Sequence, residues 1–295
     1  MTTRQYILFL IPTLIWGSTW YAIKFQLGST DPLVSVSFRF ILAGILLIVF
    51  SIVTGKKMKF SPREHFFMAL LVFSLFGINY WFVYKAETIL TSGIVAVIFS
   101  LIIFFNIAFN AIFLKGKIKP EVTIAAFLGV GGTFLLFKNE FKNFSLTSED
   151  IIVLFFCLGG LVTASLGNII SAYSQKKKIP VIQANAFGMT YGGIMMFIAA
   201  LILNKPIAIE TSSGYLISLL YLVIFGSIIA FSCYLKLLGE IGPDRAIYIA
   251  LLTPAIAMVI STFFEGYRWD IYAFLGIILL FSGNILALKM KKQTT

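Results

Sequence analysis

Aromatic side chains recur inside the long apolar segments of this chain. Trp16 and Trp20 are four residues apart, so they share one face of a helix. Tyr80 and Tyr84 have the same spacing in a later segment. Such rings bind small solutes through apolar contacts and cation–π interactions. These residues therefore indicate a solute-binding cavity, while the alternative for them is an aromatic belt at a membrane interface.

Amide side chains also lie within the apolar segments, where they need hydrogen-bond partners. Asn79 and Asn168 come from opposite halves of the chain, and each has the chemistry to bind either a solute or a neighbouring helix. Tyr234 follows Tyr84 by 150 residues, and Thr253 precedes a mid-segment proline. The candidate cavity residues are Trp16, Trp20, Asn79, Tyr80, Tyr84, Asn168, Tyr234 and Thr253.

Two further residues are candidates for a structural or gating role. Arg39 lies about six residues, or roughly 9 Å, inside its apolar segment. A charge at that depth faces the interior of a helix bundle or water, or it snorkels to the lipid headgroups, and direct contact with a solute is a third alternative. Pro254 lacks a backbone donor, so it predicts a kink that either lines the cavity as a hinge or merely bends its helix.

The elements that position these residues must be membrane helices. Of 295 residues, 59% are hydrophobic and 12% charged, and the mean hydropathy is +0.97. Soluble domains carry about 25% charged residues, and the apolar runs approach the roughly twenty residues that cross a bilayer as a helix. The fold class is therefore an all-α integral membrane protein embedded in a lipid bilayer.

Ten spans can be drawn, and the charges between them indicate an orientation. The spans are 6–24, 33–54, 66–86, 90–114, 122–137, 150–173, 180–203, 214–237, 246–264 and 271–288. Lys and Arg concentrate in the connections on the side of the N-terminus, which the positive-inside rule places in the cytoplasm. Both termini are therefore predicted to be cytoplasmic. The same rule accounts for the net charge of +11 without nucleic-acid binding.

The spans divide into two similar sets of five. Residues from 77 to 114 match residues from 227 to 264 at an offset of 150, as in the pairs Tyr84/Tyr234 and Ala96/Ala246. An odd number of spans makes the second set inverted relative to the first, which is common in secondary transporters. We expect one repeat over residues 1–138, a connection over 139–149 and a second repeat over 150–295.

Several short motifs resemble the EamA-type transporters of the drug/metabolite transporter superfamily. They are Trp16-Gly17-Ser18 with Lys24, Arg39-Phe40, Thr253-Pro254 before Glu265-Gly266, and the helix with Gly276 and Gly283. The first repeat departs from the family pattern at Phe104-Phe105, where proline is frequent, and at Lys115, where glutamate is frequent. The resemblance implies a ten-helix carrier of small metabolites whose cavity is bounded by spans one, three, four, six, eight and nine.

The chain lacks the usual signs of energy coupling and catalysis. Glu87, Glu265 and Asp270 fall at the outer ends of spans. Since proton-coupled carriers usually hold an ionisable group within the membrane, facilitated transport or exchange is favoured. The single histidine, His65, falls in a connection, and no ATP-binding loop or reactive set of side chains is evident. We expect no enzyme activity, metal or cofactor.

The sequence as a whole predicts a secondary transporter in the plasma membrane, and a bacterial inner membrane is the favoured location. It would export a small organic metabolite, such as an amino acid or an amphipathic compound, by alternating access. The alternative is an oligomeric membrane channel or scaffold without carrier activity. Gly188 and Gly192 form a GxxxG pair that packs helices either within the bundle or across a homodimer.

Overall fold

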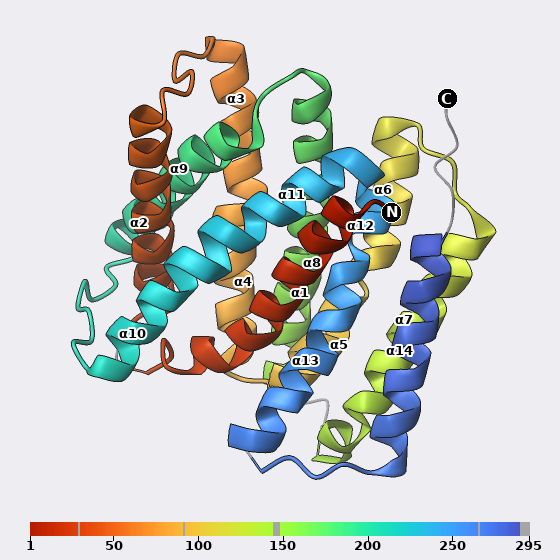
Figure 1. Cartoon of the computed structure of the whole chain (residues 1–295). Helices are drawn as coiled ribbons and strands as arrows, with labels where there is room; N and C mark the ends of the chain where they lie inside the picture. The colour runs from red at the N-terminus through yellow and green to blue at the C-terminus, as the bar shows by residue number, and fades with distance from the viewer. Residues whose placement is uncertain (29, 91, 144–147, 265, 290–295) are drawn as a thin grey trace.

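Helices account for every regular element in the described part of the chain, which is residues 1–28, 30–90, 92–143, 148–264 and 266–289 of a computed structural model (Figure 1). The first half contains α1 (Thr3–Lys24), α2 (Pro32–Val53), α3 (Pro62–Leu71), α4 (Ile78–Glu87), α5 (Ser92–Ser100), α6 (Ile102–Leu114) and α7 (Pro120–Leu136), followed by a 3-10 helix, Lys138–Asn143. The second half contains α8 (Ser148–Lys176), α9 (Val181–Ile202), α10 (Ser213–Tyr221), α11 (Ala230–Ile241), α12 (Pro243–Ala246), α13 (Tyr248–Phe264) and α14 (Ile271–Lys289).

Ten spans form as the sequence predicts. Within the described residues, eight continuous helical stretches are long and apolar enough to cross a membrane, and two shorter apolar helices, Pro120–Leu136 and Ile271–Ala287, complete the set. Large apolar side chains cover the outside of the bundle, such as Ile45 and Val49 on α2 and Phe281 on α14. A soluble protein would bury such a surface, whereas lipid tails cover it here. The chain is therefore a multi-pass membrane protein.

Local sequence signals set the beginnings of several helices. The Asp31 side chain accepts a hydrogen bond from the backbone N–H of Leu33, directly before a proline at the first position of α2. Ser61 and Glu64 form a reciprocal capping box at the start of α3. These caps satisfy backbone donors that would otherwise be unpaired where each span enters the membrane.

The third span of each half contains a π-helical segment in the same place. Val72–Gly77 joins α3 to α4, and Leu222–Ile229 joins α10 to α11, so the two segments begin 150 residues apart. Each fourth span is also interrupted, at Leu101 between α5 and α6 and at Ile247 between α12 and α13, but these two positions do not match at the 150-residue offset. The repeat predicted from the sequence is therefore visible in irregular features of the helices.

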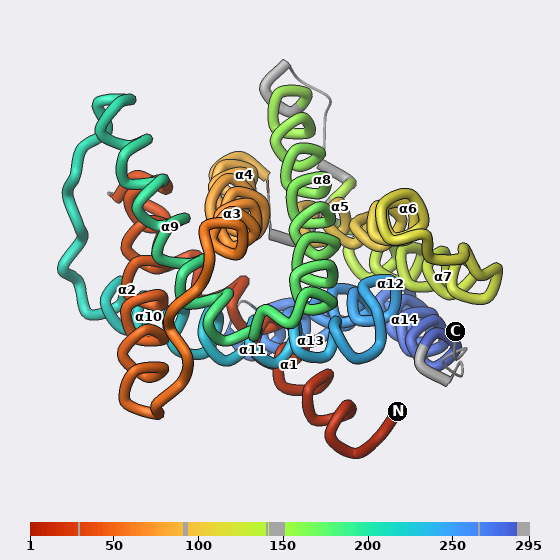
Figure 2. Tube along the Cα trace, turned by 90° about the horizontal axis from the view of Figure 1, so that it is seen from above, coloured from red at the N-terminus to blue at the C-terminus, as the bar shows by residue number. Residues whose placement is uncertain are grey.

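The helices pack with an approximate twofold symmetry, in which each half of the chain takes the place of the other. α2 lies beside α9 on one flank and α7 beside α14 on the other, as Figures 1 and 2 both show. The contact of Gly44 with Thr190 has its counterpart in the contact of Ile41 with Gly193, so the offset between α2 and α9 is 149 residues. A Cβ atom on Gly44 would lie 2.2 Å from the Thr190 hydroxyl oxygen, so a glycine is needed at this crossing.

The glycine pair of α9 is used inside the bundle. A Cβ atom at Gly188 would lie 3.3 Å from the Phe76 ring, and one at Gly192 would lie 3.0 Å from Val72. Both glycines thus let the π-helical segment of the first half approach α9. The GxxxG pair is therefore used in packing within the bundle.

The N-terminus and the end of α14 lie at the same end of the bundle (Figure 1). Arg4 of α1 forms an ion pair of 2.7 Å with Glu240, near the end of α11, so α11 also ends there. α1 and α4 end at the opposite side, which brings Lys24 and Glu87 toward the other end of the bundle.

Candidate binding cavity

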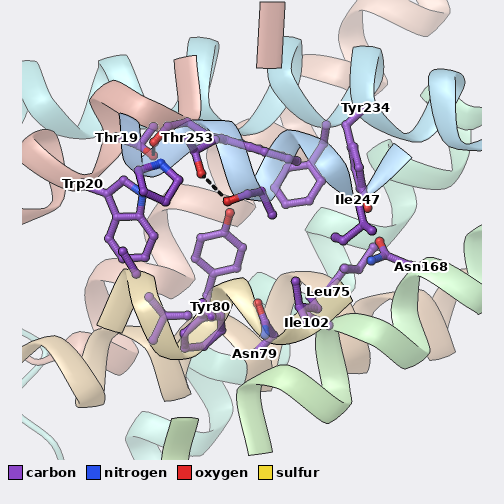
Figure 3. A pocket seen from close by; sticks show the side chains of 18 of the residues that line it. Thr19, Trp20, Leu75, Asn79, Tyr80, Ile102, Asn168, Tyr234, Ile247 and Thr253 are labelled. Carbon is purple, nitrogen blue, oxygen red and sulfur yellow. Dashed lines mark hydrogen bonds between the residues drawn. The ribbon is translucent and has the colours of Figure 1, made fainter. Parts of the chain in front are cut away.

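A cavity of about 160 Å³ lies in the centre of the bundle (Figure 3). It is lined by spans one, three, four, six, eight and nine, the six spans that the family resemblance implies. Most of its wall is apolar or aromatic. Eight of the residues predicted from the sequence line it, namely Trp16, Trp20, Asn79, Tyr80, Asn168, Tyr234, Thr253 and Pro254. Arg39 and Tyr84 are not among the lining residues.

Trp16 is fixed by the second half of the molecule. Its indole ring meets Phe231 and Tyr234 edge to face, with ring centroids 5.0 and 5.1 Å apart. The indole Nε1 donates a hydrogen bond of 3.1 Å to the backbone carbonyl of Gly226, which belongs to the π-helical segment of the eighth span. The altered hydrogen-bond ladder of a π segment makes such a carbonyl available, so this irregularity positions a cavity wall.

Tyr80 extends from α4 into the cavity, with Trp20 on one side and Tyr234 with Asn168 on the other (Figure 3). Behind its ring, the Arg39 guanidinium carbon lies 4.6 Å from the ring centroid, a cation–π contact. Phe40 packs edge to face against the same ring, at a centroid distance of 4.9 Å. The tyrosine is therefore held from behind by a cation and an aromatic ring.

Arg39 is 1% exposed, so its side chain faces the bundle interior and does not snorkel to the headgroups. Its Nε donates a 2.9 Å hydrogen bond to the Ser227 hydroxyl, and its Nη1 lies 3.5 Å from the Tyr84 hydroxyl. Tyr84 is fully buried. These contacts connect α2 and α4 of the first half with the π-helical segment of the second half.

A group of polar side chains forms the opposite end of the cavity. The Ser165 hydroxyl and the Asn168 amide nitrogen both donate to Asn106 Oδ1, at 2.7 and 3.3 Å. The Tyr234 hydroxyl faces Asn168. In the described structure, Asn168 Oδ1, Asn106 Nδ2 and the Tyr234 hydroxyl remain without a partner of good hydrogen-bond geometry. Buried polar atoms normally have partners, so Asn168 Oδ1 and the Tyr234 hydroxyl, which line the cavity, are left for a solute.

The two remaining polar candidates also hold the backbone. Asn79 Nδ2 donates a 2.7 Å hydrogen bond to the Gly160 carbonyl, so it joins α4 to α8. The Thr253 hydroxyl donates a 3.0 Å bond to the Ala250 carbonyl, which Pro254 four residues later cannot bond. The threonine beside the proline therefore takes up the carbonyl that the proline leaves unbonded.

A second, wider hollow of about 970 Å³ opens at the end of the bundle that holds the N-terminus, and we call it the vestibule. Its charged lining residues are Lys115, Lys117, Lys119, Lys176, Lys236, Glu240, Asp244 and Arg245. Three helices lead from the cavity to it, since Ile102, Asn168 and Tyr234 line the cavity while Asn110, Ala172 and Leu238 line the vestibule on the same helices. The polar group around Asn106 lies between the two hollows.

Three parts of this site were missed from the sequence. Phe231 packs against Trp16 but is one of 31 phenylalanines, so its type carried no signal. Ser165 lies among small residues of α8. Gly226 acts through its backbone carbonyl, so its residue type carried no signal. No cluster of three His, Cys, Asp or Glu side chains suited to a metal occurs in the residues that the structure describes.

Comparison with known proteins agrees with this architecture. The family model described as the EamA-like transporter family matches residues 3–138 and 151–289. The chain is 31% identical to the uncharacterized inner membrane transporter YedA of Escherichia coli K12 over 257 residues, which are 86% of this chain and 80% of YedA. It is 26% identical to the protein PagO of Salmonella typhimurium over 286 residues, 96% of this chain and 92% of PagO.

One solved crystal structure has the same fold over the whole bundle. It superposes with a TM-score of 0.79 at 14% sequence identity, covering 97% of each chain. That likeness concerns the fold alone, whereas the family model covers both halves of the sequence, and YedA is a named transporter. The chain belongs to the EamA-like transporter family.

Proposed function

We propose that this protein is a secondary carrier that moves a small amphipathic organic metabolite across the plasma membrane by alternating access. The observation that carries the proposal is the central cavity, which both halves line and which combines an aromatic wall with one unsatisfied polar end. A solute with an apolar or aromatic body and one hydrogen-bonding group is complementary to it.

The size of the cavity limits the solute. At about 160 Å³ it is close to the roughly 150 Å³ apolar cavities that accommodate benzene. Trp16, Tyr80 and Phe231 supply the surfaces for such a body, and Asn168 and Tyr234 supply an acceptor and a hydroxyl. Amino acids with a small aliphatic side chain, and amphipathic metabolites of similar size, are the class we favour.

The vestibule supports a route to one side of the membrane. Its lysines make it the side that the positive-inside rule places in the cytoplasm. Both termini would then be cytoplasmic, and the polar group around Asn106 would separate the cavity from that side in the conformation described here. We call the opposite end of the bundle, where α1 and α4 finish, the Arg39 end. A solute that enters from the vestibule would be exported when the Arg39 end opens.

Counterflow in proteoliposomes tests the proposal. Liposomes are preloaded separately with pooled amino acids, nucleosides or organic acids, and uptake of a labelled member of each pool is followed. A carrier gives saturable uptake that unlabelled internal solute stimulates. Flux without saturation and without this stimulation would instead support a channel, and no flux in any pool from folded protein would contradict the favoured solute classes.

A matched pair of tryptophan variants tests the location of the site. Trp16→Ala removes a cavity wall and should raise KM for the transported solute at least several-fold. Trp269→Ala makes the same chemical change outside the cavity, where the indole bonds Thr262, and should leave KM unchanged. Equal effects of the two changes would place recognition elsewhere.

A further inference from the structure

A carboxyl group is buried at the Arg39 end of the bundle without a hydrogen-bond donor. Glu87 is the last residue of α4, and neither of its carboxyl oxygens is exposed or has a hydrogen-bond partner in the described structure. Ala86 and Leu90 belong to a buried apolar cluster against which Trp20 packs. An ionised carboxylate without donors is costly to bury, and a neutral carboxylic acid much less so.

The charged and titratable groups near this carboxyl come from three helices. Lys24 of α1 and Arg39 of α2 act on it electrostatically, and Tyr84 lies one turn earlier on its own helix. Glu87 hydrogen-bonds to none of them. Arg39 already donates to Ser227 and contacts the Tyr80 ring. The carboxyl also lies at the C-terminus of α4, where the helix dipole disfavours a negative charge.

Glu87 lies next to the part of the cavity that must open at this end. Val83 lines the cavity, and Glu87 follows it by four residues on the same face of α4. Trp20 lines it from α1, and Lys24 follows by four residues in the same way. Separation of α1 from α4 would therefore admit water to the carboxyl and the cavity together.

We propose that Glu87 is a proton-binding site that couples protons to the carrier cycle. It is neutral while this end of the cavity is closed, and it exchanges its proton with water when the cavity opens. The ionised carboxylate of the open form is then stabilised by the charges of Lys24 and Arg39. The coupling rests on the carrier function proposed above, whereas proton binding itself does not. Glu87 does lie at the end of its span, as predicted, but its side chain faces inward.

Infrared spectroscopy of the purified protein tests proton binding without any solute. Exposed carboxyls are ionised at neutral pH, so the C=O band of a carboxylic acid would report a buried neutral one. We expect this band in the wild type, its loss in Glu87→Gln, and its retention in Glu121→Gln, which makes the same change at an exposed glutamate of α7. Glu87→Asp, which keeps a carboxyl, should retain a shifted band. No band in the wild type, or an equal band in Glu87→Gln, would overturn the proposal.

Cysteine labelling tests the link to opening. Val83→Cys, in a chain with Cys157→Ser and Cys233→Ser, places a reporter thiol on the cavity wall beside Glu87. In this background, the rate of maleimide labelling should increase with pH. The increase should be several-fold smaller when Glu87→Gln is added, and it should be unchanged when Glu121→Gln is added. Identical pH profiles would overturn the coupling. Because neither measurement needs transport, failure of counterflow would reject the carrier function separately.

Discussion

The two third spans place a tyrosine at equivalent positions and use it differently. Tyr84 is fully buried behind the cavity wall, 3.5 Å from Arg39 Nη1. Tyr234, 150 residues later, lines the cavity, and its hydroxyl faces Asn168 without good hydrogen-bond geometry. The arginine makes the difference, since the matching turn of α9 carries Gly188 and Met189.

This contrast shows how a duplicated scaffold acquires two unlike ends. The backbone plan is shared, down to the π-helical segments, but the Arg39 end has a buried cation and a buried carboxyl, Glu87. The equivalent of Glu87 in the second half is Leu237, which is fully buried and apolar. The tyrosine of one half is thus tied to a cation, whereas that of the other half is available to a solute.

The largest effect is expected from making the Arg39 end resemble its counterpart. Arg39→Met removes the donor to Ser227, and each buried polar group left without a partner costs about 1–3 kcal/mol. Thermal unfolding should occur at a markedly lower temperature and counterflow should be lost. Adding Ser227→Gly, which copies Gly77 of the first half, should restore part of the stability. If Arg39→Met alone is as stable as the wild type, the contact of the buried cation with Ser227 does not stabilise the packing of the two halves.

The next effect concerns energy coupling. In liposomes with a solute that is active in counterflow, Glu87→Gln should abolish accumulation driven by a pH gradient, because no carboxyl remains to exchange a proton. Uptake is measured with and without an imposed gradient in wild-type and Glu121→Gln proteoliposomes as well. Gradient-driven accumulation that survives in Glu87→Gln would assign coupling to another group.

Smaller effects are expected from removing the hydroxyl of Tyr84 or of Tyr234, and the two changes should affect different properties. Tyr234→Phe should raise KM about fivefold, the equivalent of about 1 kcal/mol, with little change in stability, because its hydroxyl faces Asn168 without good hydrogen-bond geometry. Tyr84→Phe should lower the unfolding temperature slightly and leave KM unchanged. Transport kinetics and thermal unfolding of both variants separate the two roles, and the reverse pattern would contradict them.

The smallest effect is expected at the proline of the ninth span. Thr253→Val keeps the shape but removes the donor to the Ala250 carbonyl, which should cost about 0.5–1.5 kcal/mol. Thr253→Ser keeps the hydroxyl and serves as the control. Thermal unfolding of the two variants provides the measurement, and equal losses would mean that the methyl group, not the hydrogen bond, matters.

Hydropathy alone predicted the ten spans, because membrane helices need apolar stretches whatever their packing. Trp16, Asn79 and Asn168 were placed near one cavity because polar or aromatic groups at membrane depth face the interior. Sequence could not give the rotation of a helix around its axis. It also could not show where along a span the cavity ends. Tyr84, on the same face of α4 as Tyr80, lies behind the wall, and Glu87, at the end of its span, is turned inward.

The π-helical segments were beyond prediction for a different reason. They depend on the hydrogen-bond register of the backbone, and the apolar residues of Val72–Gly77 are compatible with an ordinary α-helix. The 150-residue offset in the sequence indicates that the third spans of the two halves are similar. It does not indicate that both contain π-helical hydrogen bonding.

The segment Leu222–Ile229 also determines what insertions and deletions the chain tolerates. A π segment accommodates one residue more than the α-helix on either side of it. Deletion of a single residue there would remove this extra residue and restore an α-helix, so Phe231 and Tyr234 would keep roughly their present direction, but the Gly226 carbonyl would enter the regular helix ladder and no longer be available to Trp16. Single-residue gaps at this point of the chain, which leave hydropathy profiles almost unchanged, would therefore mark relatives in which the tryptophan of the first span is held differently.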